Sequence, residues 1–381
     1  MRNLALQAPF RTVRRRPRAV FLPEQGNHLD ESSFVMEIAR GHRLTPKLSV
    51  SVVIPCYNAA PWISSAIASV AAQRVPPQEV ILVDDGSTDG SGDIVRRSRC
   101  DVKRLATPRL GAAGALNAGL EAATGDWIAF LDADDFWHPN HLERAAVLLD
   151  GTSDSGMLNH GHYATLNGGL RLRPYRWPMA EPTAGLSAEQ FLIAYNAVRY
   201  FVGMSACIVR REAALQVGGF DESQTARLDI EFWLRLIARS TWSFDPVPSS
   251  AYRHRVPGSL SSDYVRAQYF HLLGFIKNER SYPYPTMRRL LARCARRAMA
   301  AALTEGTATD VMMAERLAEP WLFRKDRLLL SMAKRAPRLF GSLNRRRRRL
   351  IGACAHIAGA PTSPPAPRHS TIDARGYTYL R

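Results

Sequence analysis

Short apolar runs alternate with segments of helical periodicity over residues 48–149, and this alternation limits the possible fold more than any other feature. The runs suit buried strands of a parallel sheet, which are apolar along their whole length. Right-handed crossovers through helices join such strands, so their carboxyl ends meet at one edge. The sequence therefore predicts a doubly wound α/β sheet up to about residue 150. The expected strands are 48–55, 79–83, 102–107 and 127–131, and the expected helices are 60–73, 93–97, 111–123 and 139–149.

The pattern is weaker after residue 150 and later becomes helical. Glycine, proline and aromatic residues predict loops and short strands over 151–200. Further along we expect a strand and a helix with a Gly-Gly stop (207–220), a helix (228–240), a loop (250–262) and Arg-rich helices (287–303 and 324–335). These changes divide the chain into a basic, loosely ordered extension (1–46), an α/β domain (47–262), an Arg-rich helical region (263–350) and a disordered tail (351–381).

The positive charge of the chain is concentrated in its tails. Of the net charge of +17, little belongs to residues 47–320, which carry 29 basic and 28 acidic residues. Residues 321–381 carry 14 basic and two acidic residues, including five consecutive arginines at 345–349. Such tails attract phosphate-rich partners, either anionic lipid or nucleic acid. The basic segments lack interleaved aromatic residues and a recognition motif, so we do not expect a nucleic-acid partner.

Composition indicates a globular protein of the cytoplasm. Hydrophobic residues make up 46% of the chain and charged residues 22%. No run approaches 18 uninterrupted apolar residues, and the basic N-terminus lacks the features of a secretory signal. The five cysteines are scattered and never spaced as CxxC, which is typical of reduced thiols. We expect a cytoplasmic protein that is peripheral on the inner face of the cell membrane if the basic tail binds anionic lipid.

Two carboxylate clusters follow two different predicted strands. Asp132, Asp134 and Asp135 come directly after the apolar run WIAFL, and Asp84 and Asp85 follow EVILV. Both clusters would lie at the carboxyl edge of the sheet, where open α/β sheets bind ligands. Carboxylates packed this closely stay ionised only beside a cation or open water. The sequence therefore predicts a divalent metal, Mg²⁺ or Mn²⁺, with a phosphate group on its far side.

Five stretches together resemble family 2 of the glycosyltransferases, which use nucleotide sugars. They are SVVIPCYNAAPWISSAIASV, EVILVDDGSTDGS, GAAGALNAGLEAATGDWIAFLDADDFW, REAALQVGGFDES and DIEFWLRL, and they cover roughly residues 48–240. The resemblance implies the GT-A fold, a Rossmann-like, mostly parallel sheet flanked by helices, here with a helical, basic C-terminal extension. It also implies that the α/β domain has a nucleotide-binding half (47–150) and an acceptor-binding half (151–262).

The resemblance implies roles for residues at the ends of the first strands. Pro55 and Tyr57 match the end of the family's first strand, where the tyrosine contacts the nucleotide base. Either Asp84 or Asp85 would accept a hydrogen bond from a ring N–H of that base. Asp132 matches the acidic residue that contacts ribose or the water shell of the metal. Asp134 matches the metal ligand that bridges to the diphosphate. For Asp135 we expect a supporting role, as a helix N-cap or behind the ligands.

The catalytic base is expected at the start of the helix over 228–240. Asp229 matches the family aspartate that deprotonates the acceptor hydroxyl, with a plain N-cap as its alternative role. Leu228 stands where the family usually has glutamate, and Glu231 is the other candidate base. The resemblance also places Asp221 in an acceptor-side loop, where we expect a structural role. His254 resembles a family histidine that binds the metal or closes over the diphosphate, although its spacing differs.

The expected activity is the metal-assisted transfer of a single sugar with inversion. Processive members of the family carry Gln-x-x-Arg-Trp after the base, and the one Arg-Trp pair here, Arg176-Trp177, precedes Asp229. The donor would be a nucleotide diphosphate sugar, UDP-linked, and the acceptor a glycan or a lipid-linked molecule. Arg253 and Arg255 are alternatives to His254 for contact with phosphate. The alternative function is a non-catalytic module of the same fold that binds nucleotide sugar or glycan. Leu228 favours this alternative, because it stands where the family usually has glutamate.

Overall fold

A computed structural model describes residues 48–322 except 99, 151, 153–154, 167–168, 175–180, 199–201 and 254–261, together with residues 327 and 331. The described residues all belong to one compact unit, Pro46–Arg381. The expected N-terminal extension, His254 and the arginine run 345–349 lie outside the described residues. Of the predicted helix 324–335, only residues 327 and 331 are described, and both are helical.

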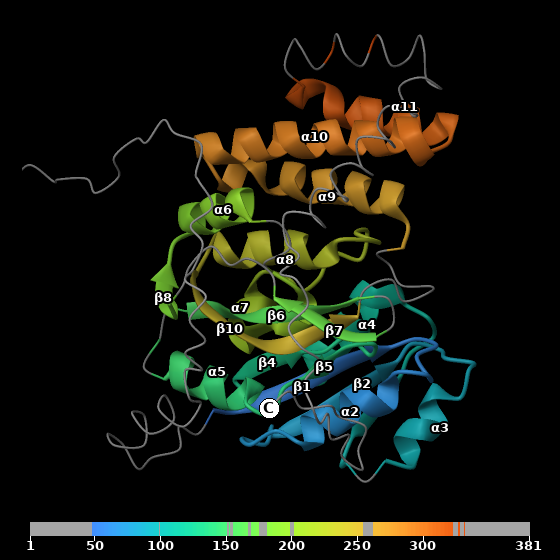
Figure 1. The fold of residues 1–381 in the computed structure, drawn as a ribbon, viewed down its shortest axis with the longest axis vertical. Helices are drawn as coiled ribbons and strands as arrows, with labels where there is room; N and C mark the ends of the chain where they lie inside the picture. The colour runs from blue at the N-terminus through green and yellow to red at the C-terminus, as the bar shows by residue number, and fades with distance from the viewer. Residues whose placement is uncertain are drawn as a thin grey trace, which may run out of the picture. The chain divides into compact units, whose positions relative to one another are not determined.

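The described residues form one mixed sheet in the order β3-β2-β1-β4-β9-β6-β10-β5, with β7 beside β6 and β8 beside β10 (Figure 1). The four strands expected before residue 150 are parallel, as predicted. They are β1 (Val50–Cys56), β2 (Glu79–Asp84), β3 (Lys103–Ala106) and β4 (Trp127–Phe130). The others are β5 (Phe136–Trp137), β6 (Ser155–Leu166), β7 (Gly169–Pro174), β8 (Thr183–Leu186), β9 (Cys207–Arg210) and β10 (Thr241–Arg253).

Helices cover both faces of this sheet, because its central strands are apolar on both sides. In β1, Val53 packs in one core cluster, whereas Val52 and Ile54 pack in the other. One layer comprises α2 (Ile63–Ala71), α3 (Ser91–Arg96) and α5 (His141–Leu149). The opposite layer includes α4 (Gly111–Ala122), α6 (Ala188–Ala197), α7 (Arg211–Gln216), α8 (Leu228–Ile237), α9 (Tyr264–Asn278), α10 (Pro285–Glu305) and α11 (Ala308–Ala318).

The C-terminal helices are stacked on α8, in the part of the α/β domain that follows residue 150. Figure 1 shows α8, α9, α10 and α11 in successive layers, and each contacts the next. The buried face of α10 is made of Leu, Ala, Met and Cys side chains, whereas most of its arginines lie outside that face. Within the described part of the chain, no helix combines the length and the apolar character that crossing a bilayer requires.

The expectation of loops and short strands over 151–200 was only partly right. The chain there forms the 12-residue strand β6 and the helix α6. A local signal for α6 is present, because Ser187 accepts a hydrogen bond from the Gln190 backbone and the Gln190 side chain accepts one from the Ser187 backbone. This capping box marks a helix start that the sequence interpretation missed.

The expected loop over 250–262 begins later than predicted, because β10 continues to Arg253. β10 pairs with β6 along most of its length, and the register shifts between Asp245 and Pro248 and again before Ser250. Proline cannot donate a ladder hydrogen bond, and β-bulges are the positions where a strand tolerates it. Pro246 and Pro248 therefore interrupt the sequence pattern without ending the strand.

A buried ion pair joins α5 to the strands behind the carboxyl edge. Asp245 is fully buried, and both its oxygens contact Arg144, with Nε to Oδ2 at 2.6 Å and Nη2 to Oδ1 at 2.7 Å. His160 Nδ1 lies 3.0 Å from the same Oδ2. Burial alone would raise the pKa of Asp245, but the hydrogen bonds from His160 and Arg144 outweigh it and lower that pKa.

Replacing Asp245 with Asn is expected to destabilise the protein by about 3–5 kcal/mol at neutral pH, because the buried Arg144 loses its counter-charge. The difference from wild type should shrink below about pH 4, since a carboxylate with a lowered folded-state pKa stabilises the fold only while it is ionised. Urea unfolding at several pH values measures this. The control is Glu143→Gln, which breaks the exposed ion pair with Arg74 and should cost less than about 1 kcal/mol. Equal losses in the two variants would contradict the prediction.

Candidate metal and catalytic site

The predicted site residues lie at the ends of strands that meet at one edge of the sheet, or directly after them. β1 pairs in parallel with both β2 and β4, in a register that places Cys56 beside Asp84 and Val53 beside Phe130. Residues that follow these three strands therefore emerge at the same edge, as the sequence predicted. The 3-10 helix η1 (Met204–Ala206) and the end of β10 also reach this edge, through contacts with the residues after β4.

Three aspartates gather directly after β4. Carboxylate oxygens of Asp132, Asp134 and Asp135 all lie within 4.8 Å of one another. Burial raises the pKa of Asp132 to about 8, and repulsion from Asp134 and Asp229 contributes. Burial also raises the pKa of Asp134 and of Asp135. Without a cation nearby, these buried carboxylates resist losing their protons. A divalent cation would take the place of those protons, and carboxylate oxygens are hard ligands of the kind that such a cation prefers.

Asp135 supports the other two aspartates from behind. Its Oδ2 accepts a hydrogen bond from Ser205 Oγ at 2.6 Å, and its Oδ1 accepts one from the Arg253 backbone at 2.8 Å. Ser205 Oγ also accepts from the Asp132 backbone at 3.0 Å, so one hydroxyl connects two aspartates. The expectation of support is in line with these contacts. The N-cap alternative was wrong, because α5 begins at His141 and its N-cap is Asn140.

Arg253 brings a positive charge to the carboxylates. Its guanidinium lies over the rings of Trp62 and Phe136, 4.9 and 5.0 Å from their centroids. Its charge acts against the rise in the pKa of Asp134. The Nε atom is buried and has no hydrogen-bond partner among the described residues. Of the two alternatives to His254 for phosphate contact, Arg253 is the one that the structure describes, and it lies beside the carboxylates.

The residues predicted to bind the nucleotide include two buried aspartates and an exposed ring. Asp84 accepts hydrogen bonds from the Ser87 backbone and from Arg104 Nη2, both at 3.0 Å. Asp85 accepts from Thr107 Oγ1 and from two backbone N–H groups after it, at 2.6–2.8 Å. A carboxylate can accept about four hydrogen bonds, so both retain capacity for a ligand.

Tyr57 is 40% exposed and already has a cationic neighbour. The Arg109 guanidinium lies 4.1 Å from the centre of its ring and donates to its hydroxyl. Arg109 has a positive φ of 56°, which a non-glycine residue rarely adopts, in the loop anchored by Asp85. The sequence interpretation did not find this contact, which joins residues 52 positions apart. It places a guanidinium on the ring that we expected to contact the base.

Asp229 lies at the start of α8 and acts electrostatically on the carboxylate cluster. Its charge contributes to the raised pKa of Asp132, so the two side chains lie near each other. Burial raises the pKa of Asp229 itself, and the Arg227 guanidinium acts against that rise. The N-cap position of α8 is occupied by Arg227, so Asp229 does not have the N-cap role that was its alternative.

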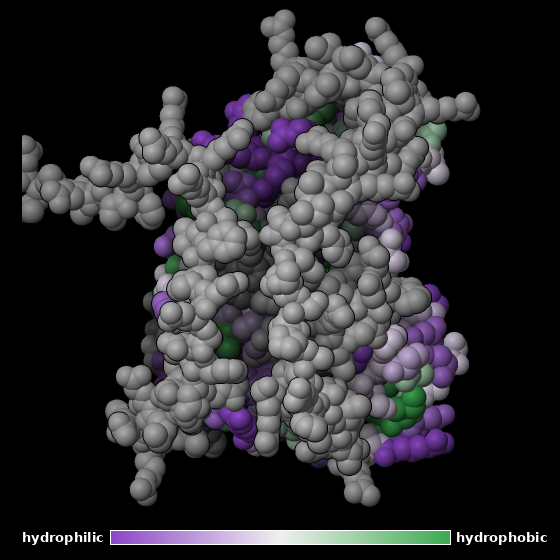
Figure 2. All heavy atoms as spheres, in the orientation of Figure 1, coloured by the Kyte–Doolittle hydropathy of each residue, from purple (hydrophilic) through white to green (hydrophobic). Residues whose placement is uncertain are grey.

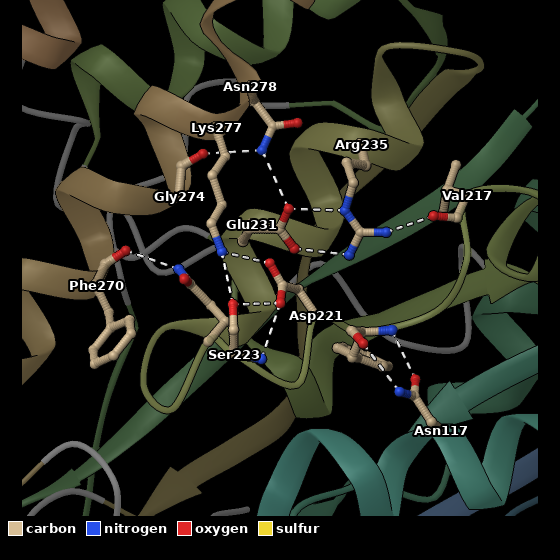
Figure 3. Close-up of polar contacts among 12 residues, drawn as sticks. Asn117, Val217, Asp221, Ser223, Glu231, Arg235, Phe270, Gly274, Lys277 and Asn278 are labelled. Atoms are coloured by element: carbon tan, nitrogen blue, oxygen red, sulfur yellow. Dashed lines mark hydrogen bonds and ion pairs between the residues drawn. The ribbon is translucent and has the colours of Figure 1, made fainter.

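Glu231, the other candidate base, is committed to structure. Its side chain is buried and forms two hydrogen bonds with Arg235, at 2.8 and 2.7 Å, as Figure 3 shows. Arg235 also donates to the carbonyl of Val217 at 2.6 Å, which ties α8 to the Gly-Gly turn. Leu228 is buried in the apolar core. Both side chains are therefore buried and engaged in the packing of α8.

Asp221 has the structural role that was expected of it. Its carboxylate accepts from the Ser223 backbone and hydroxyl, and from Lys277 Nζ of α9 at 2.5 Å (Figure 3). Burial acts to raise the pKa of Asp221, but these hydrogen bonds lower it overall. Asn117 of α4 bonds to Phe220 of the same loop through both its amide atoms. The loop is therefore fixed between α4 and α9.

Comparison with known families agrees with this geometry. Residues 51–211 match the family model described as Glycosyl transferase family 2. Residues 51–211 of the chain belong to this family. The family 2 match begins at the second residue of β1, contains the three aspartates and η1, and ends at the first residue of α7. Asp229 and Arg253 lie beyond the matched residues, so their assignment depends on the geometry described above.

Curated relatives match over parts of their length. The amylovoran biosynthesis glycosyltransferase AmsB of Erwinia amylovora is 31% identical over 199 residues, 49% of this chain and 64% of AmsB. The Escherichia coli enzyme WfgD, a UDP-Glc:alpha-D-GlcNAc-diphosphoundecaprenol beta-1,3-glucosyltransferase, is 38% identical over 120 residues, 31% of this chain and 47% of WfgD. The chain thus spans less than two thirds of either relative.

A solved structure confirms the fold. Residues 1–349 of Staphylococcus aureus TarS, crystallised with UDP-GlcNAc, superpose with a TM-score of 0.60 and 20% identity, over 78% of this chain and 92% of that one. The expected fold class is therefore confirmed, a mostly parallel GT-A sheet flanked by helices with further helices at the C-terminal side.

Proposed function

We propose that this chain is an inverting, non-processive glycosyltransferase that moves one sugar from a nucleotide diphosphate sugar to a hydroxyl group. The observation that carries the proposal is the proximity of Asp229, the candidate base, to Asp132 in the carboxylate cluster. A base and a metal site from different parts of the chain would then serve the same reaction. This is the arrangement that sugar transfer from a diphosphate requires, because one group must receive a proton while negative charge grows on another.

The donor would bind across the carboxyl edge. Tyr57, Pro55 and either Asp84 or Asp85 would contact the nucleotide, and Asp132 would lie towards the ribose. Asp134 would bind Mg²⁺ or Mn²⁺, with His254 as a second predicted ligand. When bound, the ion supplies positive charge to the departing nucleoside diphosphate. The Arg253 guanidinium, with its buried Nε lacking a partner among the described residues, would add charge-assisted hydrogen bonds to the same diphosphate.

The acceptor would approach from the side of α8. The Asp229 carboxylate would take the proton of the acceptor hydroxyl as its oxygen forms a bond to the anomeric carbon. The bond from that carbon to the diphosphate oxygen breaks on the opposite face, which inverts the configuration. Burial raises the pKa of Asp229, and this makes it a stronger base than an exposed aspartate.

The donor and acceptor classes are supported by relatives. WfgD uses UDP-Glc and a diphosphoundecaprenol acceptor, and TarS was crystallised with UDP-GlcNAc. We therefore propose a UDP-sugar donor and a glycan or lipid-linked acceptor for this chain. Attachment of the basic tail, 321–381, to an anionic membrane surface stays a prediction, because nearly all of that segment lies outside the described residues.

The test is a screen of nucleotide sugars against the full-length protein with Mn²⁺ or Mg²⁺, measuring release of the nucleotide. We expect release with at least one UDP-sugar and its loss when EDTA removes the metal. Tight donor binding by calorimetry, without release or transfer to any glycan or lipid-linked acceptor, would instead favour the alternative of a non-catalytic binding module. Metal-independent release at the same rate would contradict the proposed role of Asp134.

A further inference from the structure

Side chains from three helices and from the N-cap residue of α8 form one group. The end of α6 contributes Tyr195, α9 contributes His271, and Arg227 directly precedes α8. Arg293 and Arg297 come from α10, which packs on both α6 and α9 in the stack of helices seen in Figure 1. Arg227, Arg293 and Arg297 are called the arginine cluster below. The group is separate from the carboxylates after β4.

The arginine cluster surrounds a histidine. Burial, followed by the positive charges of Arg227, Arg297 and Arg293, lowers the pKa of His271 to about 3. The ring is therefore neutral at physiological pH and adds no charge. Its Nε2 atom lies 2.8 Å from the Tyr195 hydroxyl. Three guanidinium groups thus lie around one neutral, buried ring.

The three arginines differ in what they already contact. Arg293 donates to the carbonyls of Asn196 at 2.7 Å and Tyr195 at 3.4 Å, so it joins α10 to the end of α6. Arg227 has a positive φ of 53° and its charge reaches Asp229. Arg297 is half-buried, and its Nη2 atom is buried without a hydrogen-bond acceptor among the described residues. A buried donor without an acceptor is unfavourable, because it has lost its hydrogen bonds to water and gained none in return.

The surroundings of the cluster are also basic. Arg288, Arg289 and Arg296 are exposed on α10. Figure 2 shows hydrophilic residues gathered over the visible part of this helix. A surface with one sign of charge raises the local concentration of oppositely charged ligands. An anion would therefore be drawn towards α10 before it meets the half-buried guanidiniums.

We propose that the arginine cluster binds a phosphate group of the acceptor substrate and so directs the acceptor hydroxyl towards Asp229. This inference rests on the proposed glycosyltransferase function. A phosphate presents several oxygens to guanidinium donors, and Arg297 Nη2 would gain the acceptor that it lacks. Arg227 would link the two roles, since its charge acts both at His271 and at Asp229.

This phosphate is distinct from the diphosphate of the donor. Arg253, from β10, is the arginine whose charge acts on Asp134 in the carboxylate cluster. The arginine cluster acts instead on Asp229 and His271, through residues of α8 and α10. The charge of the base therefore acts on a carboxylate of the candidate metal site, and the base itself is acted on by Arg227 of the arginine cluster. Two phosphate-bearing substrates could be bound at the same time.

The test is a titration of the full-length protein with inorganic phosphate in EDTA, followed by calorimetry and by the ring resonances of His271. Wild type should bind phosphate, and its negative charge should raise the pKa of His271. Arg297→Gln should bind phosphate roughly tenfold more weakly or worse, because it loses charge-assisted hydrogen bonds. The control is Arg316→Gln, which removes the same charge from an exposed position on α11 and should match wild type.

Equal phosphate affinity in Arg297→Gln and wild type would overturn the proposal. The measurement on His271 uses the wild-type protein and needs no variant. A pKa of His271 that does not change at saturating phosphate would also overturn the proposal. Arg297→Lys, which retains the charge with fewer donors, should lie between wild type and Arg297→Gln. Phosphate affinity and the pKa of His271 report on binding itself. A purely structural role of Arg297 would change the melting temperature of the variant without changing either of them.

Two further measurements on the same proteins separate the sources of the phosphate. Vesicles of phosphatidylcholine with a polyprenyl diphosphate, compared with vesicles lacking it, test a lipid-linked acceptor, and a soluble sugar 1-phosphate tests a glycan acceptor. Arg297-dependent binding to either one supports the proposal and identifies the source. UDP-sugar binding with Mg²⁺ should be equal in wild type and Arg297→Gln. If neither wild type nor Arg297→Gln bound the UDP-sugar, the proposed function would be contradicted. The phosphate titration would still show whether the arginine cluster binds an anion.

Discussion

Replacing Asp134 with Asn is expected to lower metal-dependent sugar transfer by about 10³-fold or more. The amide has the size of the carboxylate but lacks its charge, so a divalent ion loses its principal ligand. Asp135 cannot compensate, because its two oxygens already accept hydrogen bonds from Ser205 and from the Arg253 backbone. The variant should fold well, since it removes one of three carboxylates that repel one another.

Release of nucleotide from a UDP-sugar, measured against Mn²⁺ concentration, checks this prediction. The control is Asp126→Asn, which changes an exposed aspartate at the opposite end of β4 and should keep full activity. Asp134→Asn should still bind the nucleotide in EDTA, because Tyr57 and the aspartates after β2 are intact. Wild-type turnover in Asp134→Asn would rule out the metal role.

The location of the carboxylate cluster was predictable because it depends on local features and one rule of topology. The apolar run of β4 ends where Asp132 begins, so the strand and its polar end are both visible in the sequence. Parallel pairing of β1 with β2 and β4 then brings their carboxyl ends together. Asp84 and Asp132 could therefore be assigned to one edge without knowledge of any side-chain contact.

The support of the cluster was not predictable, because it comes from distant parts of the chain. Ser205 bonds to Asp135 across 70 positions and belongs to a 3-10 helix with no clear sequence signal. Arg253 is placed by Trp62 and Phe136, which lie on different elements. Such contacts depend on how the elements pack, and the hydrophobic period of each element does not specify that.

The part of the domain after residue 150 was harder to predict for a related reason. β6 and β10 pair with each other over most of their length, yet the sequence of each contains glycine, proline or polar residues that are typical of loops. Long-range pairing stabilised these strands despite their weak individual patterns. The arginine cluster also escaped notice, because Arg227 and Arg297 are 70 positions apart and each alone is typical of a solvated helix surface.

The sequence left two carboxylates on α8 as candidate bases, and their surroundings distinguish them. Glu231 lies in a fixed pair with Arg235 and contacts Asn278 of α9. Asp229, two residues earlier, points to a different side of the helix and acts on Asp132. Replacement of the two should therefore affect different properties of the protein.

Replacing Asp229 with Asn is expected to lower sugar transfer to an acceptor by roughly 10²–10⁴-fold, the usual contribution of a general base. Donor binding should be unchanged, because Tyr57 and Asp134 lie on other elements. Slow release of nucleotide to water should persist, since the metal would still assist departure of the diphosphate. Transfer and hydrolysis, measured separately with one UDP-sugar, would show a loss confined to transfer.

Glu231→Gln is the matched control, because it makes the same chemical change on the same helix. It should lower the free energy of unfolding by roughly 2 kcal/mol, as Arg235 loses its charged partner, and leave transfer by the folded protein intact. The wild-type rate of transfer should fall with decreasing pH as Asp229 gains a proton, at a higher pH than for an exposed aspartate, because burial raises its pKa. That acid limb should persist in Glu231→Gln and disappear in Asp229→Asn. The opposite result would make Glu231 the base, which would require the Glu231–Arg235 pair to open before each turnover.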